Sequence, residues 1–187
     1  MTDPSRDDGK PRPGEVALSW WRALQGRDES HPRPDRASLA RLRRCRQPLD
    51  VIDVAAYYGL LRRHGVAASG READRLAVVA AVLAHVREHR GDKKVARQIG
   101  PTAAEADDGV MSEARFRRLL RVQGDDELLR AMVRLVKMLK GEVNVADLAD
   151  GILRWNESTR RRWAFAYFDA EGAAPAGAAR PQSTSPN

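Results

Sequence analysis

Apolar residues recur with the period of a helix along almost the entire chain, and no segment alternates polar and apolar residues as a half-buried strand does. The extreme case is residues 76–83, where every side chain is apolar. A helix that is apolar on all sides has to be covered by other elements on all sides. The sequence therefore predicts an all-α protein, a helical bundle of about nine helices, with this segment at its centre.

Capping residues and glycines predict where the central helix begins and ends. Ser69 and Glu72 form the pattern of a capping box before it, and Gly91 is expected to stop it after Arg90. Further along, a polar segment interrupts the helical pattern. We expect a seam between two small packed lobes near residues 100–111.

The two ends of the chain lack helical periodicity and are rich in proline, glycine, alanine and polar residues. We expect residues 1–14 and 171–187 to be disordered tails around one all-helical domain over residues 15–170. Cys45 is the only cysteine, which excludes an intramolecular disulfide and favours a reducing compartment. No apolar run approaches the ~18 residues of a membrane span, and the first residues lack the apolar core of a signal peptide. These features predict a soluble protein of the cytoplasm.

The sequence offers no convincing catalytic or metal-binding cluster. His85 and His89 have the i, i+4 spacing of two ligands on one helix turn, but no cysteine or carboxylate cluster supplies a third ligand. We interpret them as solvated residues at the end of the central helix, and Cys45 as a structural thiol. The glycines are dispersed, so no phosphate-binding loop is present. The protein is therefore not expected to be an enzyme, and no metal ion or cofactor is predicted.

Positive charge is the feature that points to a partner. The chain has 33 Lys and Arg against 26 Asp and Glu, which gives a net charge of +7. Most of the excess is arginine, which binds phosphate through two parallel hydrogen bonds. An arginine-rich composition also follows from genomic base composition, so the positions of the arginines matter more than their number.

Four clusters of basic residues lie away from the predicted apolar faces. Arg130, Arg134 and Lys137 follow one another at i, i+4 and i+7 with no acid among them. At 1.5 Å per residue their axial steps are ~6 Å and ~4.5 Å, the scale of phosphates along a strand. The other clusters are Arg117, Arg118 and Arg121 on the preceding helix, then Arg41, Arg43 and Arg44, then Arg160, Arg161 and Arg162. Aromatic residues do not interleave with them, which favours contact with the nucleic-acid backbone over stacking on bases.

Two other functions fit parts of the same pattern. The segments KKVARQIG and MSEARFRRLLR share features with a helix-turn-helix DNA-binding regulator. However, eleven residues separate Gly100 from Ser112, where that motif has a short turn. A basic all-helical adaptor that binds other proteins would carry a similar surface.

The order and spacing of six segments resemble a known family: WWRAL, LARLRRCRQPLDV, ADRLAVVAAVLAHV, SEARFRRLLRV, LLRAMVRLVKML and ILRWNESTRRRWAFAYF. Together they are similar to the CasB family, the small subunit of the type I-E CRISPR surveillance complex Cascade, over residues 20–168. The resemblance implies an all-α, non-catalytic subunit in antiviral defence. Its implied partners are the guide-RNA-carrying backbone subunits, the large subunit and a second copy of itself. The resemblance also implies a basic surface that contacts guide RNA, target DNA and the displaced strand and stabilises the R-loop.

The resemblance further assigns individual nucleic-acid contacts by position. Those carried over are Arg44, Arg71, Arg97, Arg121, Arg130 and Arg161, with Lys93 and Lys94 in a basic loop. Combined with the basic clusters, the predicted nucleic-acid-binding residues are Arg43, Arg44, Arg71, Lys93, Arg97, Arg117, Arg118, Arg121, Arg130, Arg134, Lys137 and Arg161.

Overall fold

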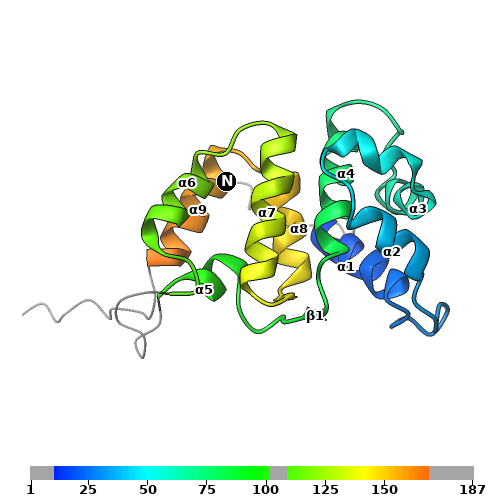
Figure 1. The fold of residues 1–187 in the computed structure, drawn as a ribbon, viewed down its shortest axis with the longest axis horizontal. Coiled ribbons are helices and arrows are strands. Elements are labelled where there is room, and N and C mark those ends of the chain that lie inside the picture. Colours follow the sequence, from blue (N-terminus) through cyan, green and yellow to red (C-terminus); the bar gives the residue numbers. More distant parts are fainter. Residues whose placement is uncertain (1–10, 102–108, 169–187) are drawn as a thin grey trace, which may run out of the picture.

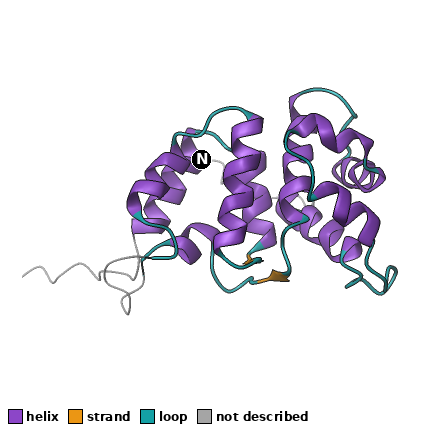
Figure 2. Cartoon of the chain, in the orientation of Figure 1, coloured by secondary structure: helices purple, strands orange, loops and turns teal. Residues whose placement is uncertain are grey.

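The computed structural model describes residues 11–101 and 109–168, and this part of the chain is almost entirely helical (Figure 1 and Figure 2). Its α-helices are α1 (Pro13–Leu24), α2 (Arg36–Leu42), α3 (Ala55–His64), α4 (Arg71–Leu83), α5 (Val95–Ile99), α6 (Glu113–Leu120), α7 (Asp125–Met138), α8 (Val145–Leu153) and α9 (Glu157–Phe168). The remaining elements are a 3-10 helix, η1 (Pro48–Asp53), and two short strands, β1 (Glu88–His89) and β2 (Glu142–Val143). This architecture confirms the all-α prediction. None of these helices combines the length and the apolar character that crossing a membrane requires.

Helix α4 is the centre of the fold, as its apolar sequence predicts. Residues 76–83 are all buried, and none of them exposes more than 2% of its surface. Helices α2 and α3 and η1 pack on α4, and so do α7 and α8. In Figure 1, α1–α4 form one end of the molecule and α5, α6 and α9 the other, with α7 and α8 between them. Helix α1 adds a second connection across the molecule, because it packs along α8.

The contact between α1 and α8 is close enough to require glycine. The Gly14 N–H donates a hydrogen bond to Asp150 Oδ1 at 2.9 Å. A Cβ atom on Gly14 would stand 2.3 Å from the carbonyl oxygen of Ala146. The backbones of the two helices therefore touch at this point, and any larger residue would push them apart.

Some of the predicted domain boundaries fall within the residues that the structure describes. Helix α1 starts at Pro13, so the helical region begins two residues earlier than the predicted boundary at residue 15. The rest of the predicted tails and most of the predicted seam near residues 100–111 fall outside the described residues. The tails and the seam therefore stay predictions.

The start of α4 differs from the predicted capping box. The position before the helix is taken by Gly70, with φ of 91°, and not by Ser69. Glycine adopts this backbone conformation without the steric penalty of other residues. The helix then begins at Arg71, with Glu72 in its first turn, where a negative charge suits the helix dipole.

The predicted end of α4 is also wrong, because the helix stops at Leu83 and not at Arg90. Beyond it the chain turns toward the segment that follows α7. The N–H groups of Arg87 and Glu88 both donate to the carbonyl oxygen of Gly141, at 2.8 and 3.1 Å, and β1 then pairs in parallel with β2. The segment HVREH is helical in period, but the N–H groups of Arg87 and Glu88 find their acceptor far along the chain, where local patterns cannot reveal it.

Contrary to the prediction, the two histidines are not solvated residues at the end of a helix. His85 follows α4 in a turn and His89 belongs to β1, and both are half-buried. His89 Nδ1 accepts a hydrogen bond from the Val145 N–H at 3.2 Å. Burial, and then the charges of Lys137 and Arg43, lower the pKa of His85 to about 4. No group of three or more potential metal ligands occurs within the described residues.

Replacing Leu135 by alanine tests the packing of α7 on α4. Leu135 exposes none of its surface, so Leu135→Ala is expected to lower the free energy of unfolding by ~2–5 kcal/mol. Arg130→Ala, on the exposed side of the same helix, should change it by less than ~0.5 kcal/mol. Chemical denaturation followed by circular dichroism measures both values. Equal stability of the two variants would contradict this packing.

The pKa of His85 predicts how stability depends on pH. The folded chain holds this pKa at about 4, below the ordinary 6.5, so the unfolded chain binds more protons between these two values. The folded state therefore loses stability as the pH falls from 6.5 toward 4. In a His85→Gln variant, the free energy of unfolding should depend less on pH between about pH 7 and pH 5. An unchanged dependence would mean that His85 is solvated in the folded chain.

Candidate nucleic-acid interface

Helix α7 presents one face to the core and another to solvent. Its inner face packs on α4 and η1. The fully buried side chains of this face include Leu128, Met132 and Leu135. The exposed face carries Arg130, Arg134 and Lys137. Both faces follow from the period of 3.6 residues, which the sequence shows clearly for this helix.

The end of α2 is tied to the end of α4 through an arginine. Arg43 Nε donates a hydrogen bond at 2.7 Å to the carbonyl oxygen of Ala84, one of the carbonyls left unpaired at the end of a helix. Next to it, the buried Cys45 thiol donates to the Arg41 carbonyl oxygen at 3.4 Å, and burial is the main cause that raises its pKa. The burial of Cys45 is consistent with its interpretation as a structural thiol. Arg43 and Arg46 both lie beside α7, where they line the same hollow.

A hollow of about 280 Å³ lies between the end of α2 and α7. The cations that line it are Arg43, Arg46, Arg130, Arg134 and Lys137. The lining also includes Leu129, Val133 and the half-buried His85. The same arrangement contributes to the low pKa of His85, because after burial its causes are the charges of Lys137 and Arg43. Two segments far apart in the sequence, the end of α2 and the exposed face of α7, thus place positive charges around the same hollow.

A second hollow, of about 400 Å³, adjoins the first between α6 and α7. Arg134 and Lys137 line both hollows, and Arg115 and Arg118 complete the basic lining of the second. One acid, Glu127, is part of its lining. We call the two hollows together the basic groove. Its cations are Arg43, Arg46, Arg115, Arg118, Arg130, Arg134 and Lys137.

The cations of the basic groove form no ion pair with any acid in the described part of the chain. Other arginines do have such partners. Arg75 Nε lies 2.9 Å from an oxygen of Asp125, and an Arg90 nitrogen lies 2.8 Å from an oxygen of Glu142. The groove is therefore a surface where positive charge is available to a ligand.

The structure brings five of the twelve predicted nucleic-acid-binding residues into this groove. They are Arg43, Arg118, Arg130, Arg134 and Lys137. On α7, all three predicted cations line at least one of the two hollows.

Two predicted residues are instead paired with acids on their own helices. Arg117 pairs with Glu113 on α6, and Arg161 pairs with Glu157 on α9, both at i, i+4 spacing. All four side chains are exposed, so these pairs are weak. Neither arginine lines the basic groove.

The other five predicted residues are spread over several elements. Arg44 and Arg121 are exposed just after α2 and α6. Arg71, in the first turn of α4, lines a separate hollow. Lys93 is exposed in the loop before α5, and Arg97 is half-buried within α5.

Two cations of the basic groove, Arg46 and Arg115, are not among the predicted nucleic-acid-binding residues. Arg115 lies about one helix turn before Arg118, so the helical period could have placed the two together. Arg46 follows the end of α2, and its position beside α7 depends on tertiary packing that no local pattern shows.

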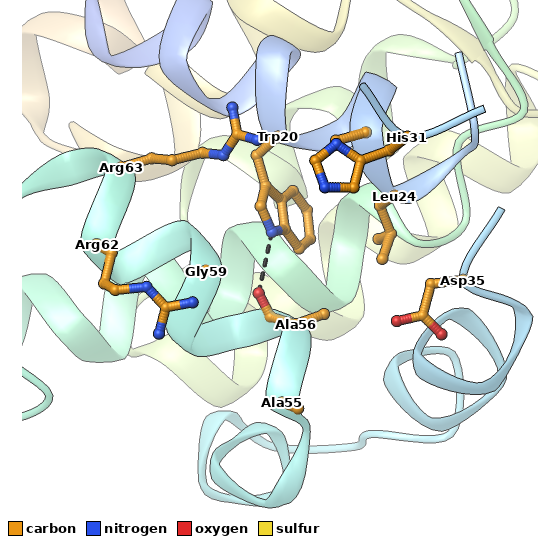
Figure 3. Close-up of a pocket in the computed structure, with 10 residues that line it drawn as sticks. Trp20, Leu24, His31, Asp35, Ala55, Ala56, Gly59, Arg62 and Arg63 are labelled. Carbon is orange, nitrogen blue, oxygen red and sulfur yellow. Dashed lines mark hydrogen bonds between the residues drawn. The ribbon is translucent and has the colours of Figure 1, made fainter. Parts of the chain in front are cut away.

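A separate hollow of about 450 Å³ involves α1, α3 and the loop after α1 (Figure 3). The Trp20 indole N–H donates to the carbonyl oxygen of Ala56 at 3.0 Å, as Figure 3 shows. Arg62 and Arg63 also line this hollow, and the Arg63 guanidinium donates to the Ser19 hydroxyl at 2.9 Å. None of the predicted nucleic-acid-binding residues lines it.

The sequence of this chain matches a known protein family. The family model described as CRISPR-associated protein Cse2 matches residues 38–168. This match runs from α2 to the end of α9 and includes every cation of the basic groove. No curated protein matches the chain at a significant level of similarity.

Two solved structures have a similar fold. The crystal structure of CasB from Thermus thermophilus is 25% identical, covers 83% of this chain and 97% of that chain, and has a TM-score of 0.60. A chain in the crystal structure of E. coli Cascade bound to a PAM-containing double-stranded DNA target is 18% identical. It covers 82% of this chain and 94% of that chain, also with a TM-score of 0.60, and shows likeness of fold alone. Because the family model matches more than half of its residues, the chain belongs to the Cse2 family of CRISPR-associated proteins, which confirms the resemblance to the CasB family of type I-E Cascade.

Proposed function

We propose that this chain is a non-catalytic subunit of a type I-E Cascade complex, and that its basic groove binds the sugar–phosphate backbone of target or displaced DNA. By holding the DNA there, the subunit stabilises the R-loop. Membership of the Cse2 family supports the place in such a complex, and so does the likeness to a chain of DNA-bound E. coli Cascade. The observation that best supports the DNA-binding role is the clustering of cations in the basic groove.

The groove suits phosphates for an electrostatic reason. Seven cations from the end of α2, from α6 and from α7 line two adjoining hollows without an ion-pair partner among the described residues. Repulsion between neighbouring like charges opposes folding. A bound polyanion removes this repulsion, and the counterions that leave it favour binding further. The charge of the groove is therefore best balanced when phosphates occupy it.

The groove offers little for reading the sequence of a duplex. The charged side chains in its lining are arginines and a lysine, with Glu127 as the one acid, and no Phe, Tyr or Trp lines either hollow. Contacts between such cations and phosphates fix the position of the DNA but carry no sequence information. Sequence selection is then left to pairing with a guide RNA on other subunits. These side chains supply charge and hydrogen-bond donors, which serve binding and not bond cleavage.

The proposal extends to the predicted residues outside the groove. Arg44 and Arg121 directly adjoin lining residues in the sequence, so they are proposed to extend the same phosphate contacts. The family resemblance is the support for the remaining contacts, at Arg71, Lys93, Arg97, Arg117 and Arg161. The same resemblance supports the partners that we propose, namely the guide-RNA-carrying backbone subunits, the large subunit and a second copy of the chain.

Reversing the charges of Arg130, Arg134 and Lys137 to glutamate tests the proposal. These side chains are exposed, so the triple variant should keep its helicity and melting behaviour, at a cost within ~0.5 kcal/mol for each substitution. The reconstituted complex should nevertheless hold its target DNA about tenfold more weakly or worse, because phosphate contacts become repulsive. The dissociation rate of labelled target DNA from the complex measures this effect.

The matched control reverses Arg33, Arg36 and Arg62, three exposed arginines outside the basic groove. It has the same net charge as the first variant and should hold target DNA as tightly as the wild type. Equal losses in both variants would show that only net charge matters. Wild-type retention by the first variant would show that the groove does not bind DNA.

A further inference from the structure

The hollow between α6 and α7 has more apolar residues in its lining than the hollow beside α2. The apolar residues that line it are Met111, Leu119, Val122, Ala131 and Met138. The first four are buried in the fold, yet each keeps 3–7% of its surface exposed. Neighbouring core residues such as Phe116 and Leu128 expose none. The lining residues therefore form an apolar floor that is open to a ligand.

Four cations surround this floor. Arg115 and Arg118 come from α6, and Arg134 and Lys137 come from α7. Glu127 is the one acid among the lining residues. A ligand that fits has an apolar or planar body with negative charge beside it. The hollow, at about 400 Å³, is within the ~300–1,000 Å³ that small-molecule sites occupy.

We infer that this hollow receives one unpaired nucleobase, while the surrounding cations hold the phosphates on either side of it. The inference rests on the proposed function and narrows it to single-stranded nucleic acid, because a base stacked and paired within a duplex cannot enter. Guanidinium planes, here those of Arg115 and Arg118, are surfaces on which unpaired bases stack. The thioethers of Met111 and Met138 also make favourable contacts with aromatic rings.

A protein ligand fits the observations less well. An acidic peptide with one apolar side chain would match this hollow, but not the cations that continue into the adjoining one. Those cations are Arg43, Arg46 and Arg130. A chain of regularly spaced phosphates matches both hollows at once. Single-stranded nucleic acid is therefore the occupant that the charge pattern favours.

The test compares a short single-stranded DNA with a strand of the same length and charge in which every base is absent. Binding of each strand to the full chain is measured by fluorescence anisotropy at several salt concentrations. The abasic strand should bind about tenfold more weakly, because one base contact is lost. Both affinities should fall with salt to the same extent, because the phosphate contacts are unchanged.

A substitution that fills the hollow between α6 and α7 tests the same base contact by changing the protein instead of the DNA. Ala131→Leu adds apolar volume without changing charge, so its affinity for the intact strand should fall to that for the abasic strand. Ala114→Leu, at an exposed position of α6 outside the lining, is the matched control and should bind like the wild type. Thermal melting checks that both variants fold. If Ala131→Leu does not fold, the comparison of the two strands on the wild-type chain decides alone.

Each contrary outcome overturns a different statement. Equal, salt-dependent affinities for the intact and abasic strands overturn the base site and leave the proposed function standing. Loss of salt-dependent binding for both strands overturns the proposed function as well. If the two strands bind equally, and an acidic, leucine-containing peptide binds the wild type but not Ala131→Leu, the hollow is a protein-docking site instead.

Discussion

The neighbouring helices are arranged around α4 because its apolar side chains have to be buried on every side. Residues 76–83 cannot face water on any side, and they are covered by α2, α3 and η1 and by α7 and α8. This cover fixes the rotation of α7 about its own axis, because Leu128, Met132 and Leu135 have to point inward. The opposite face of α7, with its cations, then lies beside the end of α2, which Arg43 ties to the end of α4. The basic groove thus follows from the way the core is closed.

Periodicity was sufficient to predict the helical class, the buried central helix and the two faces of α7, because each depends on residues within one or two turns. It failed where the partner of a segment is distant, as in HVREH, which leaves the helix to pair with Gly141. The clustering of charges in the sequence also could not predict which arginines line the same hollow in the fold. Arg43 and Arg134 line the same hollow although they are far apart in the chain. Arg117, equally prominent in the sequence, pairs instead with Glu113 one turn away.

The basic groove concentrates charge at one place and keeps that charge constant near neutral pH. His85 lines it but stays uncharged there, because burial and the neighbouring cations hold its pKa at about 4. The positive charge is thus carried by arginine and lysine alone. Of the two hollows, the one between α6 and α7 has the more extensive apolar lining. Together they account for a subunit that retains nucleic acid without reading its sequence, which is the role proposed for this member of the Cse2 family.

If the basic groove holds phosphates, DNA binding by the isolated protein should depend steeply on salt concentration. The logarithm of the association constant should fall linearly with the logarithm of salt concentration, with a slope of about −0.9 for each duplex phosphate that is neutralised. Replacing Arg134, which lines both hollows, by glutamine should make this slope shallower by about 0.9. Neither slope should depend on the DNA sequence. A slope near zero, or one that Arg134→Gln leaves unchanged, would show that the basic groove does not hold phosphates.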